Sequence, residues 1–431
     1  MKFRKQLKFM KVIKALYSVL LILFLPVAFF SQQISSMERS DILKEIKQVI
    51  KERYVLEDVA SQIVEGLNQN KYEENDTAKF LQQLNKDLRS LSQDKHLEIY
   101  QNPDFGKDPT APKSDKDKKQ NYGFSKVEIL KGNIGYLKIN YFAYPKEAAS
   151  VAKSSMNFLT NADAIVIDLR ENKGGSKAMV QLLASYFFDD EPIHLYSIYG
   201  RDGQYFHGYT EAAVEGSRMP KTPLFIICDK RTFSAAEMFA FVMKNAKGAI
   251  VIGENTAGGG HTVSSQTIGN GKFILNLPVG QVLDPKTKKG WEKTGIQPDT
   301  AISGDLAYEK AYFEALKQKM NNSEKPSDLA VIKWQSEILQ TKLEPKKVDA
   351  EILKSYAGKY ERRIITFKDG VLWYQAREGS EPAKLIPIDE RYFRFDEVDY
   401  FRVRFEKDTN GNVIGLKGVF DDGFEDYTKR N

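Results

Sequence analysis

The feature that most constrains this chain is an apolar run at 224–228 that passes through a polar turn into a helical pattern beginning at Ser234. So short a β-branched run predicts a buried strand, and the apolar spacing after Ser234 predicts a helix. Ser234 therefore stands beside the unpaired amides and the positive dipole end of that helix. This position suits a nucleophile whose product is an oxyanion. It equally suits a serine that only caps the helix, which is a common role.

Strand and helix patterns alternate on both sides of this unit, between residues 122 and 322. Strands separated by helices predict a largely parallel sheet in a layered α/β core. The predicted strands are 127–130, 134–139, 164–169, 224–228, 249–252, 262–268 and 273–277, and the predicted helices lie at about 146–159, from Ser176 and at 306–320.

The regions on either side of the core have different patterns. Residues 37–100 carry apolar side chains at helical spacing, which predicts an N-terminal helical domain. The polar segments 101–121 and 323–348 are interpreted as linkers. Residues 349–431 contain short apolar runs separated by turn signals such as Asp369-Gly370, which predicts a C-terminal all-β domain built as a meander or small barrel.

Residues 1–31 have the composition of a targeting segment. Six basic residues and no acidic ones accompany an apolar stretch at 15–30 that contains Pro26. The stretch is short for a membrane-spanning helix, so the pattern favours a secretory signal peptide, with an uncleaved anchor as the alternative. We expect a secreted or periplasmic protein with no stable membrane insertion after signal cleavage. No cysteine lies near the end of the segment, which excludes a lipoprotein anchor.

Charge and cysteine content narrow the classes of partner. Without the six basic residues of 1–31, the 64 Lys and Arg fall to 58, equal to the 58 Asp and Glu, so no charge argument favours nucleic acid. The single cysteine, Cys228, lies in the apolar run at 224–228 and is expected to be a core residue. No Cys/His cluster has zinc spacing, and we expect no metal or other cofactor. The oligomeric state stays open.

Three further stretches carry residues that suit catalysis. Gly174 and Gly175 stand between a predicted strand and a helix, where backbone amides can approach a ligand, although a tight turn explains them equally. His96 ends the N-terminal helical pattern and suits a base at neutral pH, or a histidine that stabilises a helix end. Glycines precede His261 in a turn that is expected to face substrate. Glu292 can orient a base, although a lone glutamate usually faces solvent.

Five motifs in order resemble the tail-specific (C-terminal processing) serine peptidases. They are Asp-x-His, Asp-x-Arg-x-Asn-x-Gly-Gly, Ser-Ala-Ala-Glu, Gly-Glu-x-Thr-x-Gly-Gly and Glu-x-x-Gly-x-x-Pro-Asp, within residues 40–303. The similarity is greatest to the branch that contains the tricorn core protease and interphotoreceptor retinoid-binding protein. It implies a crotonase/ClpP-like layered α/β core.

The resemblance also implies roles for individual residues. Ser234 would be the nucleophile, and the amides of Ala235 and of Gly174 or Gly175 would form the oxyanion hole. Gly258, Gly259 and His261 would contact substrate. Processing proteases carry a lysine base where this chain has Gly259, so the implied base is His96 with Glu292 in support, as in the tricorn branch. His261 is the rival base.

The chain departs from the family pattern at two places. Tricorn places a relay serine just before its histidine, where this chain has Lys95, so Glu292 is expected to contact His96 directly or to pair with Lys95. Only about 25 residues separate His96 from the first core strand, too few for a PDZ domain.

The sequence as a whole predicts a serine endopeptidase that acts on a peptide or protein. A non-catalytic protein that binds apolar ligands on the same scaffold is one alternative, although such a protein has no need for the nucleophile, base and carboxylate together. An esterase or amidase with a small substrate is the other.

Overall fold

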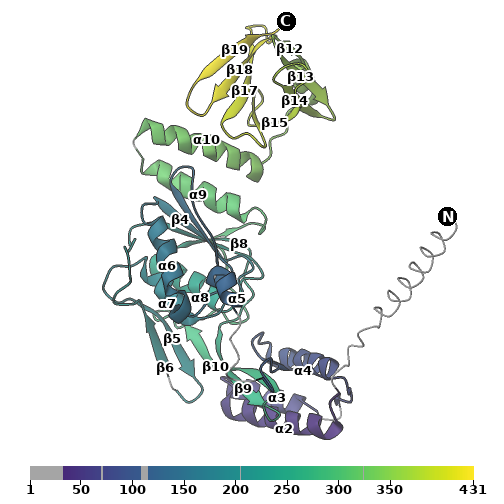
Figure 1. The fold of residues 1–431 in the computed structure, drawn as a ribbon, viewed down its shortest axis with the longest axis vertical. Coiled ribbons are helices and arrows are strands. Elements are labelled where there is room, and N and C mark those ends of the chain that lie inside the picture. Colours follow the sequence, from purple (N-terminus) through teal and green to yellow (C-terminus); the bar gives the residue numbers. More distant parts are fainter. Residues whose placement is uncertain (1–32, 69–70, 108–114, 204, 324) are drawn as a thin grey trace, which may run out of the picture.

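A computed structural model describes residues 33–68, 71–107, 115–203, 205–323 and 325–431 (Figure 1). The predicted signal peptide at 1–31 lies outside these residues. Within the described ranges, none of the helices combines the length and the apolar character needed to cross a membrane.

The centre of the molecule is a six-stranded sheet in the order β11-β8-β7-β4-β3-β2, parallel except for β2. Ile165 and Ile167 of β4 face one core and Val166 faces the other. Because both faces are buried, the strands form continuous apolar runs in the sequence. The predicted layered α/β core is confirmed. The strands are β2 (Phe124–Leu130), β3 (Ile134–Ile139), β4 (Ala164–Asp168), β7 (Leu224–Cys228), β8 (Ile250–Gly253) and β11 (Thr300–Ala301).

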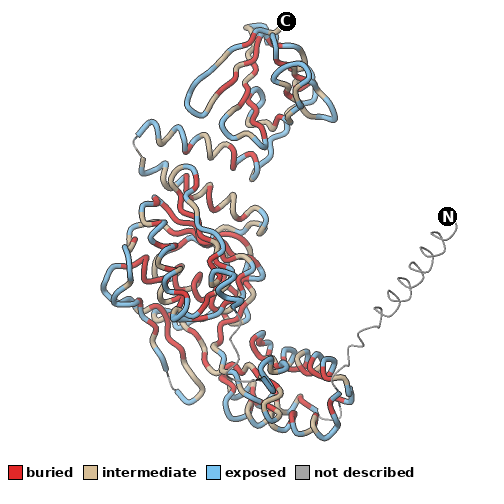
Figure 2. Tube along the Cα trace, viewed as in Figure 1, coloured by how far each residue is buried: buried red, intermediate tan, exposed pale blue. Residues whose placement is uncertain are grey.

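Helices cover both faces of this sheet, and the buried residues in Figure 2 follow the strands and the inner helix faces. On one face lie α6 (Pro145–Leu159), α7 (Lys177–Ser185) and α8 (Ala235–Val242), which runs on into a π-helical turn at Met243–Lys247. The other face carries α9 (Ala307–Asn321), backed by α10 (Pro326–Leu343). The helix α10 occupies most of the segment 323–348 that was interpreted as a linker, because Ile332 and Leu339 are buried in the α9 core.

A second sheet joins the helical region to this core. It has the order β1-β10-β5-β6, with β9 also paired to β10. The N-terminal helices pack on it, since their core includes Phe273, Leu275 and Leu277 of β10. The β5–β6 hairpin is not among the elements that the sequence predicts. The elements are α2 (Ser36–Arg53), α3 (Glu57–Gly66), α4 (Thr77–Ser92), β1 (Glu98–Gln101), α5 (Lys116–Lys119), the 3₁₀ turn Asn121–Gly123, β5 (His194–Gly200), β6 (Tyr205–Tyr209), β9 (His261–Ile268) and β10 (Phe273–Leu283).

The C-terminal region is an eight-stranded antiparallel sheet whose strands follow sequence order. A bridge between Tyr360 and Arg430 brings the last strand against the first, so the sheet closes nearly into a barrel with its own apolar core. The predicted all-β region is confirmed. After α11 (Ala350–Tyr356) come β12 (Gly358–Tyr360), β13 (Arg363–Lys368), β14 (Val371–Gln375), β15 (Ala383–Pro387), β16 (Tyr392–Phe395), β17 (Phe401–Lys407), β18 (Val413–Phe420) and β19 (Glu425–Lys429).

Candidate active site

Ser234 occupies the turn between β7 and α8, as the sequence predicts. Its backbone has φ 56° and ψ −121°, a left-handed conformation that side chains other than glycine rarely adopt. Such strain costs about 1–3 kcal/mol and persists only where the surroundings enforce it. A sharp strand-to-helix turn of this kind presents a hydroxyl at the mouth of a sheet. Ser234 is partly exposed, so a ligand can reach it.

The carboxylate of Glu237 holds this turn in place. Glu237 is fully buried, and its Oε2 accepts hydrogen bonds from the amides of Ser234 and Gly259, both at 2.8 Å. Its Oε1 accepts from the amide of Gly258 at 2.6 Å and from the hydroxyl of Thr256 at 2.5 Å. Four donors compensate a buried negative charge well. One side chain therefore ties the 256–259 loop to the Ser234 turn.

His96 lies against Ser234, with its Nε2 3.0 Å from Ser234 Oγ. It does not belong to the last turn of a helix, because α4 ends at Ser92 and Gln93 adopts a left-handed conformation after it. The imidazole packs beside the ring of Phe233, with centroids 4.4 Å apart. The helical region and the α/β core thus bring together two residues that lie far apart in the sequence.

Burial lowers the pKa of the His96 imidazole to about 4, although the charge of Asp94 opposes this. At neutral pH the ring is therefore uncharged. In the tautomer with the proton on Nδ1, Nε2 accepts the Ser234 hydroxyl proton, which is what a general base requires.

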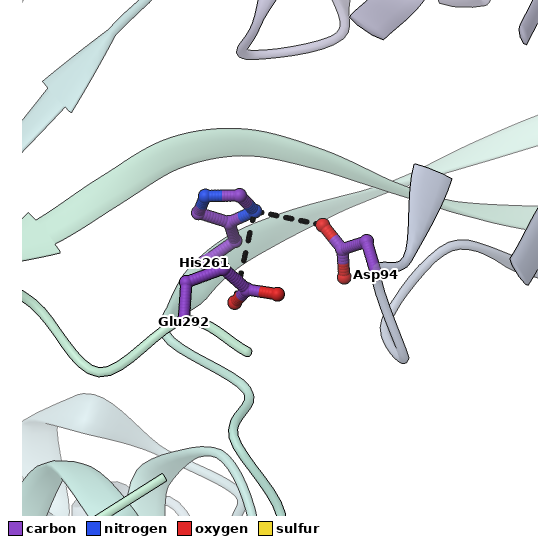
Figure 3. Close-up of side chains that lie close together, drawn as sticks. All are labelled: Asp94, His261 and Glu292. Atoms are coloured by element: carbon purple, nitrogen blue, oxygen red, sulfur yellow. Dashed lines mark hydrogen bonds and ion pairs between the residues drawn. The ribbon is translucent and has the colours of Figure 1, made fainter. Parts of the chain in front are cut away.

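Asp94, His261 and Glu292 lie close together (Figure 3); the first two are buried and Glu292 is half-buried. The Oδ2 atom of Asp94 lies 2.7 Å from Nδ1 of His261. Glu292 Oε2 lies 3.8 Å from the same nitrogen and accepts the amide of Gly260 at 2.6 Å. Burial, and then the charge of Asp94, raises the pKa of Glu292 to about 7. Glu292 is therefore only partly ionised at neutral pH.

The contacts expected of Glu292 are not present. Glu292 makes no ion pair with His96, and the ammonium of Lys95 donates instead to the carbonyl of Ala257. The amide of Gly260 holds the Glu292 carboxylate on the His261 side of the cluster. His261 is bonded to Asp94 rather than to Ser234, so the histidine in contact with the serine is His96.

Among the described residues, this cluster is also a group that could hold a metal ion. Its candidate ligand atoms from Asp94, His261 and Glu292 lie within 4.8 Å of one another. His261 and Tyr54 bond to Asp94 Oδ2, and the amide of Gly260 donates to Glu292 Oε2, whereas Glu292 Oε1 is buried without a hydrogen-bond partner.

The predicted oxyanion donors lie beside Ser234. Gly174 packs against Ser234 and Ala235 so closely that a Cβ there would meet the Ala235 nitrogen at 2.8 Å. Its amide donates to Oδ1 of Asn172 at 2.8 Å. Ala235 is the first residue of α8, so its amide has no acceptor within the helix. Gly175 and Ala235 both line the pocket at Ser234, so these two amides are the better placed pair.

A pocket of about 300 Å³ opens at Ser234. Gly259 and His261 line it, as predicted for substrate-contacting residues, but Gly258 does not. Apolar side chains form much of the wall: Met238, Val263, Val282 and Trp291.

Sequence reasoning missed two residues that organise this site. Asp94 lies in the Asp-x-His motif and Glu237 in Ser-Ala-Ala-Glu, but neither motif predicts a role for them. A glutamate three residues after a capping serine is the pattern of a capping box, which could have identified Glu237. The position of Asp94 relative to His261 depends on the packing of separate segments and carries no local signal.

Two family models match this chain. Residues 133–302 match the model of peptidase family S41, and residues 33–126 match the model of the N-terminal domain of Peptidase_S41 in eukaryotic IRBP. Carboxyl-terminal-processing peptidase 2, chloroplastic, from Arabidopsis thaliana is 29% identical over 182 residues, which are 42% of this chain and 34% of that protein. Carboxy-terminal processing protease CtpB from Bacillus subtilis (strain 168) is 29% identical over 209 residues, which are 46% of this chain and 41% of that protein.

The chain thus spans less than half the length of these two curated relatives. Among solved structures, a lipoprotein from Streptococcus agalactiae superposes with a TM-score of 0.47 at 16% identity, covering 67% of this chain and 99% of that chain.

Proposed function

Because this chain belongs to peptidase family S41, we propose that it is a serine hydrolase that cleaves peptide bonds, with Ser234 as the nucleophile and His96 as the general base. The observation that carries the proposal is the 3.0 Å separation between His96 Nε2 and the hydroxyl of a serine held at positive φ. A capping serine needs neither the strained backbone nor a neutral imidazole at its hydroxyl.

The chemistry proceeds in two halves. Ser234 Oγ attacks the substrate carbonyl as its proton moves to Nε2 of His96, and the carbonyl oxygen becomes an oxyanion that accepts from the amides of Gly175 and Ala235. The C–N bond then breaks, and His96 returns the proton to the leaving amine. A water molecule repeats the sequence on the acyl-enzyme, which releases the acid and restores Ser234.

The pocket supports a peptide with an apolar side chain next to the scissile bond. Met238, Val282 and Trp291 provide apolar surface beside Ser234 and Ala235, which is how a small pocket favours one side chain over a charged one. The base and the oxyanion amides that meet Ser234 beside this pocket favour hydrolysis over storage of an apolar ligand.

Active-site labelling tests the proposal. We expect a fluorophosphonate probe to label the wild-type protein and to leave Ser234→Ala unlabelled. Ser176→Ala is the matched control, because Ser176 lines the same pocket at the start of α7 and should not affect labelling. Absence of labelling in folded wild type, or labelling of Ser234→Ala at the wild-type rate, would reject the nucleophile.

Substrate class and location need separate measurements. Hydrolysis of a peptide library, beside small esters, separates an endopeptidase from an esterase by which substrates depend on Ser234. We further propose that the protein acts outside the cytoplasm, on the basis of the basic and apolar pattern of residues 1–31. The N-terminal residue of the protein recovered from its host would reveal cleavage near residue 31; retention of Met1 on a cytoplasmic protein would argue against export.

A further inference from the structure

We infer that Asp94, rather than Glu292, is the carboxylate that positions His96 and stabilises its protonated form, and that His261 and Tyr54 hold Asp94 for this purpose. The inference rests on the proposed function of Ser234 and His96. It makes Asp94 a positioning residue, because it acts on the reacting serine through the imidazole.

The first evidence is the surroundings of His96 Nδ1. This nitrogen is buried and has no hydrogen-bond partner. Asp94 Oδ1 lies 3.8 Å from it, and no other carboxylate among the described residues forms an ion pair with this ring. The separation is longer than a hydrogen bond, as catalytic contacts often are before substrate binds.

The second evidence is the way in which Asp94 is fixed. Its Oδ1 accepts a hydrogen bond from the backbone amide of His96 at 2.9 Å, which keeps the carboxylate beside His96. Its Oδ2 lies 2.7 Å from His261 Nδ1 and accepts the Tyr54 hydroxyl at 3.2 Å. Asp94 itself is 1% exposed. Tyr54 follows α2 and His261 begins β9, so separate segments of the chain lock one carboxylate.

The third evidence is charge. When His96 takes the serine proton, it becomes a cation in a buried site, which is costly without a nearby anion. Asp94 favours the protonated imidazole, whereas His261 opposes it and Glu292 has no comparable influence. The bonds of Tyr54 and of His261 to Asp94 keep this anion in place. Glu292 lies 3.8 Å from His261 Nδ1, so it acts on His261 and not directly on His96.

Two measurements on the full chain test the assignment. The first follows the four histidines by NMR in protein labelled with ¹³C-histidine, with His96 assigned from His96→Ala. We expect Asp94→Asn to lower the pKa of His96 and Glu292→Gln to leave it unchanged. This measurement needs no turnover, so it decides the inference even if Ser234 labelling rejects the proposed function.

The second measurement is steady-state kinetics on a peptide substrate. We expect Asp94→Asn to lower kcat by about 10²- to 10⁴-fold with little change in KM, as loss of a carboxylate behind a catalytic histidine does. Glu292→Gln should lower kcat by less than about 10-fold, since it does not touch His96. Asp87→Asn is the matched control, because Asp87 is a buried carboxylate on α4 that also accepts a tyrosine hydroxyl, at 2.8 Å, away from the site. It should lower the thermal midpoint without changing kcat.

Three results would overturn the assignment. The first is a Glu292→Gln variant that lowers the His96 pKa or kcat as much as Asp94→Asn does. The second is a loss of kcat in Asp94→Asn that merely matches the Asp87→Asn control. The third is a wild-type activity that disappears on dialysis against EDTA and returns with Zn²⁺, which would give the cluster to a metal.

Discussion

The helical region at one end of the molecule and the β domain at the other relate to the α/β core in opposite ways (Figure 1). The helices share their apolar core with β10 and supply His96 and Asp94 to the site. The β domain has its own core and supplies no residue to the pocket at Ser234. Its contacts with α10 include the indole of Trp334, which donates to the carbonyl of Asp399 at 2.5 Å, and the guanidinium of Arg402, 3.5 Å over that indole. The helical region therefore contributes to the site, whereas the β domain packs against α10 and contributes no residue to the pocket.

The largest effect should come from removing the proposed base, His96, which the helical region supplies. We expect His96→Ala to lower kcat by about 10⁴- to 10⁶-fold, because the serine loses its proton acceptor and the imidazolium. Peptide hydrolysis with a thermal-unfolding control measures this. If His261→Ala lowered kcat by this amount and His96→Ala stayed nearly active, the base would be His261 of β9. The helical region would then not supply the base.

A matched pair of core substitutions sharpens the comparison. Leu84 in the helical core and Leu416 in the β-domain core are both fully buried. We expect either Leu→Ala change to cost about 2–5 kcal/mol of the unfolding free energy of its own region. Only Leu84→Ala should also lower kcat, because it loosens the region that holds His96. Urea unfolding beside peptide hydrolysis tests this, and equal losses of activity in both variants would contradict it.

The pH dependence reports how deeply the helical region buries the base. Protonation removes the base, and burial lowers the pKa of His96 from its ordinary 6.5 to about 4. As pH falls, kcat/KM should therefore stay level through 6.5 and drop only near pH 4. Recovery of activity at pH 7 after brief acid exposure controls for unfolding. In Leu84→Ala the drop should move toward 6.5, whereas an unshifted wild-type drop at 6.5 would mean that His96 is solvent-exposed.

The smallest effect should follow deletion of residues 349–431. The cut falls after α10, so the core keeps α9 and α10. We expect kcat/KM on a short peptide to change by less than about 3-fold, since the deleted part lines no part of the pocket. Rates measured on the purified, folded truncation check this. A complete loss of hydrolysis would show that the β domain completes the site after all.

The sequence predicted the strands and helices that form from apolar patterns within a short segment. The β7–Ser234–α8 unit follows from one apolar run and one helical spacing, and the parallel sheet follows from several such units. His96 and Ser234, which lie 3.0 Å apart in the structure, each belong to a motif with a chemical reason for its residue type.

The arrangement behind His96 could not be predicted in the same way. The amide of Gly260 holds the carboxylate of Glu292, and the hydroxyl of Tyr54 holds that of Asp94. These contacts decide which carboxylate faces the His96 imidazole. These contacts join residues that are distant in the sequence. The segment 323–348 was interpreted as a linker for a related reason, since α10 is stabilised by packing against α9 and not by a strong amphipathic pattern of its own.

The left-handed backbone of Ser234 has a consequence for how the chain is made. The Glu237 carboxylate that enforces it depends on donors at 256–259, and the base depends on a surface of β10 that ends at Leu283. During synthesis, His96 emerges first and Ser234 about 140 residues later. The residues that hold both side chains in place follow within about the next 50 residues, up to the end of β10. A growing chain would therefore be unable to hydrolyse a substrate until nearly all of its core has been made. It would need no separate inhibitor during that time.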